Sequence, residues 1–385
     1  MAGASHSDDL GAMRQEALNA ADRISMEELR KSGRQTARER IAMLLDADSF
    51  VEVDSFVQHR SGDFNMHLHR PYGDGVVAGH GKIDGRRVVC FAQDYAVFDG
   101  TMGEMHARKI AKVAEFAEKS QLPLVGIWDG DGQRVQDGVP ALGATGELLD
   151  ILVDCSGRIP TFSIILGTVA GVSALAAGLS DFVILSDDHG QMFMRSPYFI
   201  PEIASGELDQ NSLGGADAHA SRSGVACMGA EDEEDAILTA IEILSFLPDH
   251  TLAEAITLNS GDPAHRACKN LTEIVPADSN IPYDIRKVIT EVVDEGRFLE
   301  LFSTYAENIV IGFARLDGQS VGIVANQPKV LAGCLDIDAS VKAARFIRTC
   351  DIFNIPVVTF VDVPGFLPGT VQEWGGIIRH GAKLL

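Results

Sequence analysis

The sequence predicts an α/β protein of two tandem domains, the second of them truncated. First, residues 77–132 align without gaps with residues 310–365, a shift of 233 (310 less 77), so the chain contains an internal repeat. Second, each copy reads as strand, helix and strand, which implies parallel pairing through a crossover. Third, the second copy stops at Leu385, inside the helix that matches one expected near Glu147 in the first copy.

The repeat depends on identities that share one register. They are Asp84-Gly85 with Asp317-Gly318, Gly100 with Gly333, Lys109 with Lys342, Pro123 with Pro356, Asp129 with Asp362, and Gly132 with Gly365. Both copies end on a glycine loop that follows a short apolar strand. Such a loop should lie at the carboxyl edge of its sheet, where open α/β folds usually bind ligands.

Apolar periodicity places the elements of each copy. Helical stripes at i, i+3, i+4 and i+7 occur at 110–117 and 343–350. The first copy then predicts strands at 87–92, 124–128, 161–166 and 182–185, with helices at 147–155 and 167–178. The second copy predicts strands at 320–325 and 357–361. The predicted domains are an N-terminal helical region outside the repeat (1–50), a first domain (51–260) and an incomplete second domain (261–385).

The missing part of the second copy has a physical consequence. Its sheet should lack the far strands that the first copy possesses, and one apolar helix face should stay uncovered. An open sheet edge and a bare apolar patch favour association. The 385-residue chain is therefore expected to be poorly soluble or to aggregate.

The charge balance excludes several function classes. With 55 acidic and 32 basic residues, the net charge of −23 opposes binding to nucleic acid or to anionic membranes. The acidic run 231–235 precedes a predicted helix, whose dipole favours carboxylates at that end. The N-terminus has no signal-peptide pattern and no apolar run approaches the roughly 20 residues of a membrane helix, so a cytoplasmic location is expected.

No metal site is expected from the sequence. The six cysteines lack zinc-type spacing and are interpreted as reduced core thiols. His67 and His69 form an isolated pair that is more typical of an exposed loop than of a metal site. No Walker sequence and no dinucleotide fingerprint is present, so ATP and NAD are not expected on this chain.

Several segments carry a family resemblance. The runs 36–46, 49–52, 213–216, 221–225, 362–369 and 372–385 resemble β subunits of biotin-dependent acyl-CoA carboxylases of the propionyl-CoA carboxylase type. That family has two crotonase-like domains, which would explain the repeat. The resemblance implies an acyl-CoA side in the first domain and a biotin side in the second. It also implies a large homo-oligomer, or a hetero-oligomer with a paralogue, in which the first domain of one chain faces the second of another.

The resemblance implies a chemistry that uses few side chains. A carboxyl group moves from carboxybiotin, delivered on a separate carrier protein, to the α-carbon of a short-chain acyl-CoA such as propionyl-CoA or acetyl-CoA. Backbone amides hold the enolate; by the resemblance these are the pairs Gly132–Gln133 and Gly171–Val172. Arg134 is a candidate for the CoA phosphates. Gly365 and Phe366 are candidates on the biotin side. The expected partners are a biotin carboxylase and a biotin carboxyl carrier protein.

Both glycine loops depart from the family pattern. The first usually reads Asp-Ser-Gly-Gly-Ala-Arg, whereas Asp131 and Gln133 here replace small residues. In the second, Val172 stands where a second glycine is usual, and a β-branched residue tolerates positive φ poorly. Three interpretations stay open at this point. The chain is an active enzyme of altered acyl specificity, or a degenerate or truncated non-catalytic partner in a mixed complex. The third is a sequence error or an unusual chemistry such as that of biotin-dependent decarboxylase α subunits.

Overall fold

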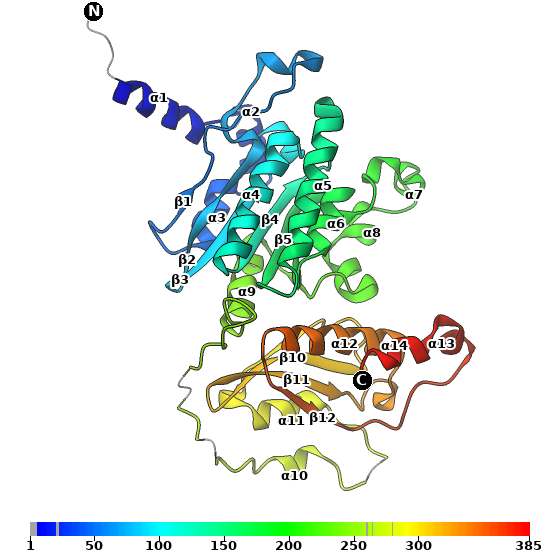
Figure 1. The fold of residues 1–385 in the computed structure, drawn as a ribbon. Helices are drawn as coiled ribbons and strands as arrows, with labels where there is room; N and C mark the ends of the chain where they lie inside the picture. The colour runs from blue at the N-terminus through cyan, green and yellow to red at the C-terminus, as the bar shows by residue number, and fades with distance from the viewer. Residues whose placement is uncertain (1–5, 21–22, 259–260, 264, 279) are drawn as a thin grey trace, which may run out of the picture. The chain divides into compact units, whose positions relative to one another are not determined.

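The structure, a computed structural model, describes residues 6–20, 23–258, 261–263, 265–278 and 280–385 (Figure 1). It divides into two compact units, each of mixed α/β composition. Unit 1 comprises Met1–Ala218 and Gly229–Ile241; unit 2 comprises His219–Met228 and Glu242–Leu385. The boundary therefore lies before the predicted 260/261. The reason is that Phe246 stacks on Phe313 with ring centroids 5.6 Å apart, which places this segment in unit 2.

Unit 1 is built on an eight-stranded sheet of order β1-β2-β3-β4-β5-β6-β8, with β7 paired to β5. An antiparallel hairpin joins β2 to β3 through Asp84 and Gly85, whose φ angles of 50° and 79° are those of a tight hairpin turn. From β3 to β6 the strands are parallel, as predicted. The strands are β1 (Val51–Glu52), β2 (Val76–Ile83), β3 (Arg86–Gln93), β4 (Leu124–Gly130), β5 (Thr161–Ala170), β6 (Phe182–Ser186), β7 (Gln191–Phe193) and β8 (Met228–Ala230).

Helices α4 and α5 pack side by side over this sheet (Figure 1). The predicted stripe of α4 is buried throughout, and α5 begins nine residues before the predicted Glu147, at Gly138. Its first two turns are rich in Gly and Ala, which hid their helical period. The helices of this unit are α1 (His6–Leu18), α2 (Arg23–Lys31), α3 (Ala37–Leu44), α4 (Glu104–Ser120), α5 (Gly138–Cys155), α6 (Val172–Gly178), α7 (Pro201–Ala204) and α8 (Gln210–Gly214), and α9 (Glu233–Ser245) spans the boundary.

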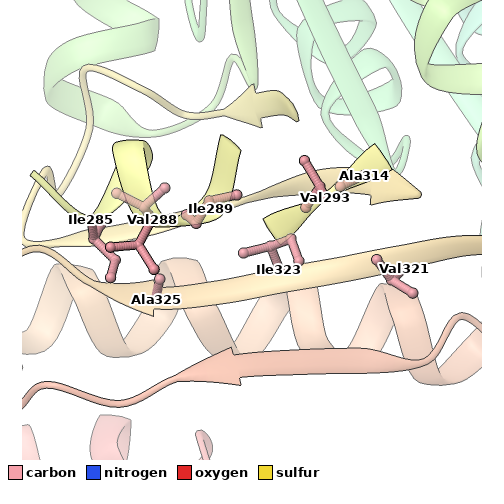
Figure 2. Close-up of a cluster of buried hydrophobic side chains, with 9 residues drawn as sticks. Ile285, Val288, Ile289, Val293, Ala314, Val321, Ile323 and Ala325 are labelled. Atoms are coloured by element: carbon pink, nitrogen blue, oxygen red, sulfur yellow. The ribbon is translucent and has the colours of Figure 1, made fainter. Parts of the chain in front are cut away.

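Unit 2 has a four-stranded sheet of order β12-β11-β10-β9. Helix α11 covers it with an apolar cluster in which Ile289 is fully buried, and Figure 2 shows these side chains between the helix and the strands. Its elements are α10 (Leu271–Ile274), α11 (Ile285–Val292), β9 (Phe298–Leu301), β10 (Ile309–Leu316), β11 (Gln319–Asn326), α12 (Ile337–Ile352), β12 (Val357–Phe360), α13 (Thr370–Gly375) and α14 (Ile377–Ala382).

The sequence repeat is a structural repeat. Elements β2, β3, α4 and β4 begin at 76, 86, 104 and 124; β10, β11, α12 and β12 begin at 309, 319, 337 and 357, each 233 residues later. The repeat also extends upstream. Helix α3 spans 37–44 and α11 spans 285–292, a shift of 248. The prediction that residues 1–50 stand outside the repeat is therefore wrong. It failed because the connection between the two registers is 15 residues longer in the first copy (248 less 233).

A buried ammonium group recurs at one place in both copies. Lys109 Nζ donates to the Val76 carbonyl at 2.7 Å, and Lys342 Nζ donates to the Ile309 carbonyl at 2.8 Å. Both acceptors are the first residue of the strand that opens the hairpin, so each lysine fixes the start of that strand. Burial lowers the pKa of Lys109 to about 8 and that of Lys342 to about 7.

The two copies differ at the far edge of the sheet. Strand β4 is buried along its length between β3 and β5. Its counterpart β12 pairs with β11 on one side and, within the described residues, with no strand on the other. Apolar side chains of α13 and α14, which follow β12 in the chain, are exposed, with Trp374 at 86% and Ile378 at 79%. The open edge expected from the repeat is therefore confirmed.

One buried histidine makes the stability of unit 1 depend on pH. The His106 ring is fully buried, with Nδ1 3.0 Å from the Asp74 carbonyl oxygen, and burial lowers its pKa to about 3. In the unfolded chain the His106 ring binds a proton below about pH 6.5, whereas in the folded chain it stays neutral until about pH 3. The free energy of unfolding therefore falls as pH falls from about 6.5 toward 3. At about pH 5 the loss should be roughly 2 kcal/mol.

Replacing His106 by Gln should flatten this part of the profile relative to the unmodified chain. Denaturant titrations of both proteins between about pH 7 and 5 measure the difference. Parallel profiles would show that His106 does not set the pH dependence.

Candidate functional site: two backbone amide loops

Two loops of unit 1 meet at the carboxyl end of neighbouring parallel strands. Gly130 at the end of β4 pairs with Val169 of β5. Gly132 has φ +81°, and a Cβ atom there would lie 3.3 Å from the Ala170 carbonyl oxygen. The structure therefore brings the predicted pairs Gly132–Gln133 and Gly171–Val172 together.

Within each pair the two amides have different roles. The Gly132 N–H donates to the Gly130 carbonyl at 2.8 Å, and the Gly171 N–H donates to the Phe193 carbonyl at 2.9 Å. The amides of Gln133 and Val172 have no acceptor among the described residues. Val172 is the first residue of α6, and first-turn amides have no partner inside their helix. Gln133 and Val172 therefore supply the available donors.

Valine at position 172 causes no backbone strain. The positive φ of this loop, 65°, is at Gly171, whereas Val172 is not among the residues with positive φ. A β-branched residue is acceptable at the start of a helix. The expected defect at Val172 is therefore absent.

The two unusual side chains of the first loop behave differently. Gln133 Nε2 donates to the Met102 carbonyl at 3.0 Å and to Thr145 Oγ1 at 2.9 Å, so this side chain anchors the loop to α5. Asp131 is half-buried, and its Oδ1 atom has no hydrogen-bond partner within the described structure. Burial, and then the nearby Asp99 carboxylate, raise the pKa of Asp131.

Arg134 is not placed to bind phosphate. Its side chain is 1% exposed, and Nη1 lies 2.5 Å from Asp74 Oδ1 and 3.7 Å from Asp137 Oδ2. Asp137 in turn accepts the Glu104 N–H at the start of α4, at 3.0 Å. The expected role for CoA does not fit this geometry, because Arg134 neutralises buried carboxylates that hold the first turn of α4.

A second buried arginine, Arg40 of α3, was not among the site residues predicted from the sequence. It links the strand before the first loop to the N-terminal region. Arg40 Nη1 lies 2.6 Å from Asp129 Oδ2, and Arg40 Nε donates to Glu233 Oε2 at 3.0 Å. Arg34 forms an ion pair with the other oxygen of Asp129. The match of Asp129 with Asp362 in the repeat signals a carboxylate at this position. The arginines that bind Asp129 were not predicted, because residues 1–50 were expected to form a separate region outside the repeat.

The corresponding loop of unit 2 keeps the same backbone contact. Met102 forms an isolated parallel bridge with Gln133, and Leu335 forms one with Phe366, both residues shifted by 233. Gly365, which precedes Phe366, has φ +150°. The Phe366 side chain is 51% exposed. Gly365 and Phe366 therefore occupy the place in unit 2 that Gly132 and Gln133 occupy in unit 1.

Other features of the sequence are explained by structure. The acidic run does open a helix, since Glu233 begins α9, although Glu233 itself pairs with Arg40. The six cysteines are free thiols. No group of three or more His, Cys, Asp or Glu side chains in the described ranges is arranged to hold a metal ion. Across the same ranges, no helix is both long and apolar enough to cross a membrane.

The structural role of Arg134 is testable. Replacing it with Met leaves the Asp74 carboxylate buried without its cation, which should lower the free energy of unfolding by about 3–5 kcal/mol. The matched control is Arg158→Met, since Arg158 pairs with Glu118 at the surface and should matter little. Denaturant unfolding of the two variants measures the contrast. Equal stability of both variants would contradict the assignment.

Comparisons with known proteins identify the family of the chain. Residues 28–385 match the family model described as the carboxyl transferase domain. The α subunit of methylmalonyl-CoA decarboxylase from Veillonella parvula is 50% identical over 360 residues, covering 94% of this chain and 71% of that protein. The propionyl-CoA carboxylase β chain of Saccharopolyspora erythraea is 49% identical over 385 residues, covering 98% and 70%.

Among solved structures, transcarboxylase 12S with methylmalonyl-coenzyme A and methylmalonic acid bound aligns with a TM-score of 0.95 and 42% identity, over 100% of this chain and 75% of that one. The match of both sequence and fold runs through the two amide loops and through both copies of the repeat. The chain therefore belongs to the carboxyl transferase domain family.

Proposed function

We propose that the chain is a carboxyltransferase subunit that moves a carboxyl group from carboxybiotin to the α-carbon of a short-chain acyl-CoA such as propionyl-CoA or acetyl-CoA. The observation that carries the proposal is the pair of ordered, unpartnered amides at Gln133 and Val172. The family supports it, as do propionyl-CoA carboxylase β chains at 49% and 44% identity. In this proposal the two compact units are tandem crotonase-like domains.

The chemical difficulty of this reaction is charge on the thioester oxygen when the α-carbon becomes nucleophilic. The Gln133 and Val172 N–H groups would donate to that oxygen, and the N-terminus of α6 adds the positive end of a helix dipole. Each such donor typically contributes about 10²–10³ in rate.

The biotin side of the site is assigned to unit 2. Gly365 and Phe366 repeat the backbone contact of Gly132 and Gln133, so an amide donor for a ureido oxygen would stand at the equivalent place. Carboxybiotin supplies the carboxyl group and arrives on a separate carrier protein. Biotin carboxylase and its carrier are the proposed partners in a cytoplasmic oligomer, and neither ATP nor a metal ion is assigned to this chain.

Two alternatives are weaker. A non-catalytic paralogue was suggested by the altered loops; against it, Val172 does not have a positive φ, and the amides of Gln133 and Val172 have no acceptor among the described residues. A decarboxylase α subunit is favoured by the Veillonella parvula relative. It would use the same amides, because loss of carbon dioxide from a malonyl-type thioester generates the same enolate. The propionyl-CoA carboxylase relatives favour the carboxylation direction.

The donor at position 172 can be removed without removing the helix. Proline lacks the N–H and is well tolerated at the first position of a helix. Val172→Pro should therefore lower kcat for propionyl-CoA carboxylation about 10²–10³-fold. Val172→Ala, which keeps the amide, should stay near the unmodified rate. The assay supplies biotin carboxylase and biotinylated carrier, and similar rates for both variants would remove Val172 from the site.

The carboxyl group of Asp131 should slow the reaction. A negative charge beside a developing enolate opposes it, and Asp131 has an unpartnered oxygen one residue from Gly132. Removing the charge in Asp131→Asn, or the whole side chain in Asp131→Gly, should raise the carboxylation rate about tenfold, which corresponds to roughly 1.4 kcal/mol of transition-state energy. A lower rate in both variants would show that Asp131 serves the reaction.

A further inference from the structure

The proposed function leaves a buried charge cluster in unit 1 unexplained. It consists of Arg34, Arg40, Asp129 and Glu233. Arg40 is 1% exposed and contacts two neighbouring strands: β4 near its end, through Asp129 Oδ2 at 2.6 Å, and β5 in its middle, through the Leu166 carbonyl at 3.5 Å. Its remaining contacts are to Glu233 at the start of α9, at 2.5 and 3.0 Å. One side chain therefore links β4 and β5, the two strands that lead into the amide loops.

The strand that leads to the second loop, β5, is packed directly on this cluster. A Cβ atom at Gly167 would lie 1.9 Å from Asp129 Oδ1 and 2.6 Å from Arg34 Nη2. Gly167 is four residues before Gly171 in the same strand and loop. Any movement of the Asp129 carboxylate or of the two guanidinium groups is thus transmitted to the backbone that leads to Val172.

The cluster also determines the electric field at the amides. Asp129 is fully buried and four residues before Gln133, so an unpaired carboxylate there would oppose negative charge on a substrate oxygen. Arg40 and Arg34 each bind one of its oxygens. The carboxylate is therefore neutralised from both sides, which preserves the donor field of the loops.

Within the described residues, the second copy has a different arrangement at the corresponding positions. The counterpart of Asp129 is Asp362, which is exposed and accepts the Tyr283 hydroxyl at 2.7 Å. The counterpart of Arg40, by the shift of 248, is Val288, which packs in the apolar cluster of α11 (Figure 2). A buried ion network often adds little stability compared with apolar residues of similar size. A contribution to stability alone therefore does not account for the network around Arg40.

We propose that Arg40, assisted by Arg34, is a positioning residue that holds both amide loops and cancels the charge of Asp129 beside them. The inference rests on the proposed function, because it concerns the field and geometry at the thioester oxygen. Arg40 does not touch the substrate; it acts through Asp129 and through the backbone at Leu166 and Gly167.

The test compares Arg40→Lys with Lys109→Met in the full chain. Lysine keeps the positive charge but cannot bind Asp129 and Glu233 together. Lys109 is an equally buried cation of unit 1 that contacts the Val76 carbonyl, so its loss controls for general destabilisation. Titration calorimetry measures affinity for propionyl-CoA and for a nitroalkyl-CoA thioether, whose nitronate anion imitates the enolate. Steady-state carboxylation assays measure kcat and KM. Amide hydrogen exchange of residues 129–136 and 167–175 measures the order of the two loops.

In Arg40→Lys, nitronate affinity and kcat should each fall at least about tenfold, while propionyl-CoA affinity and KM change by less than about twofold. Exchange should accelerate in both loops. Lys109→Met should show none of these changes. Equal loss for the two ligands, or the same pattern in Lys109→Met, would overturn the proposal.

Two further outcomes are decisive. If Arg40→Lys does not fold, Glu233→Gln replaces it, because this change weakens the same cluster at its edge. Nitronate affinity should then fall about threefold relative to propionyl-CoA affinity. An unchanged ratio of the two affinities overturns the proposal. If the unmodified chain binds neither ligand, the proposed function fails. The exchange comparison then still decides the positioning role, since unchanged loop exchange in Arg40→Lys overturns it.

Discussion

The parallel pairing of β4 with β5 is the constraint on which the rest of the site depends. It brings two chain segments to one sheet edge, where Gly130 pairs with Val169 and Gly132 faces the Ala170 carbonyl. Backbone amides that are to serve a ligand must stay ordered while lacking an internal acceptor, which is costly for buried groups. The structure solves this by using the first amide of each pair internally and leaving the second available. Gly132 and Gly171 hold the loops, and Gln133 and Val172 present donors.

The buried charged residues near this sheet edge are arranged in a way that suits the two loops. A chain of net charge −23 can serve an anionic substrate only if its local carboxylates are neutralised. Unit 1 does so with buried arginines that bind Asp74 and Asp129, the two fully buried carboxylates next to the loops. Asp131 departs from this pattern, because one of its oxygens has no partner in the described part of the chain. The buried arginines of unit 1 therefore stabilise the fold and also reduce negative charge next to the amide loops.

Much of the fold was predictable because it depends on local periodicity and on a repeat in one register. The parallel strands, α4, α12 and the open edge at β12 all follow from these signals. The upstream part of the repeat was missed, although Arg38, Ile41, Asp46, Phe50 and Glu52 recur as Arg286, Ile289, Asp294, Phe298 and Glu300. A gap-free shift cannot detect identities displaced by a further 15 residues (248 less 233).

The site was predictable in its backbone and not in its side chains. A glycine loop after a parallel strand indicates where amides gather, and the structure brings the two predicted loops together at one sheet edge. Whether an arginine faces solvent or a buried carboxylate depends on contacts across long separations, such as Arg134 with Asp74 and Arg40 with Glu233. Likewise, the strain expected at Val172 depended on which residue of the loop takes positive φ, and Gly171 takes it.

The central claim is that the amides of Gln133 and Val172 hold the thioester oxygen of an acyl-CoA. The most direct test is an experimental structure of the chain with a non-hydrolysable propionyl-CoA analogue bound. The account predicts the carbonyl oxygen within about 2.7–3.1 Å of both amide nitrogens. A bound analogue whose carbonyl oxygen lies away from both nitrogens, or contacts a side chain in their place, would contradict it.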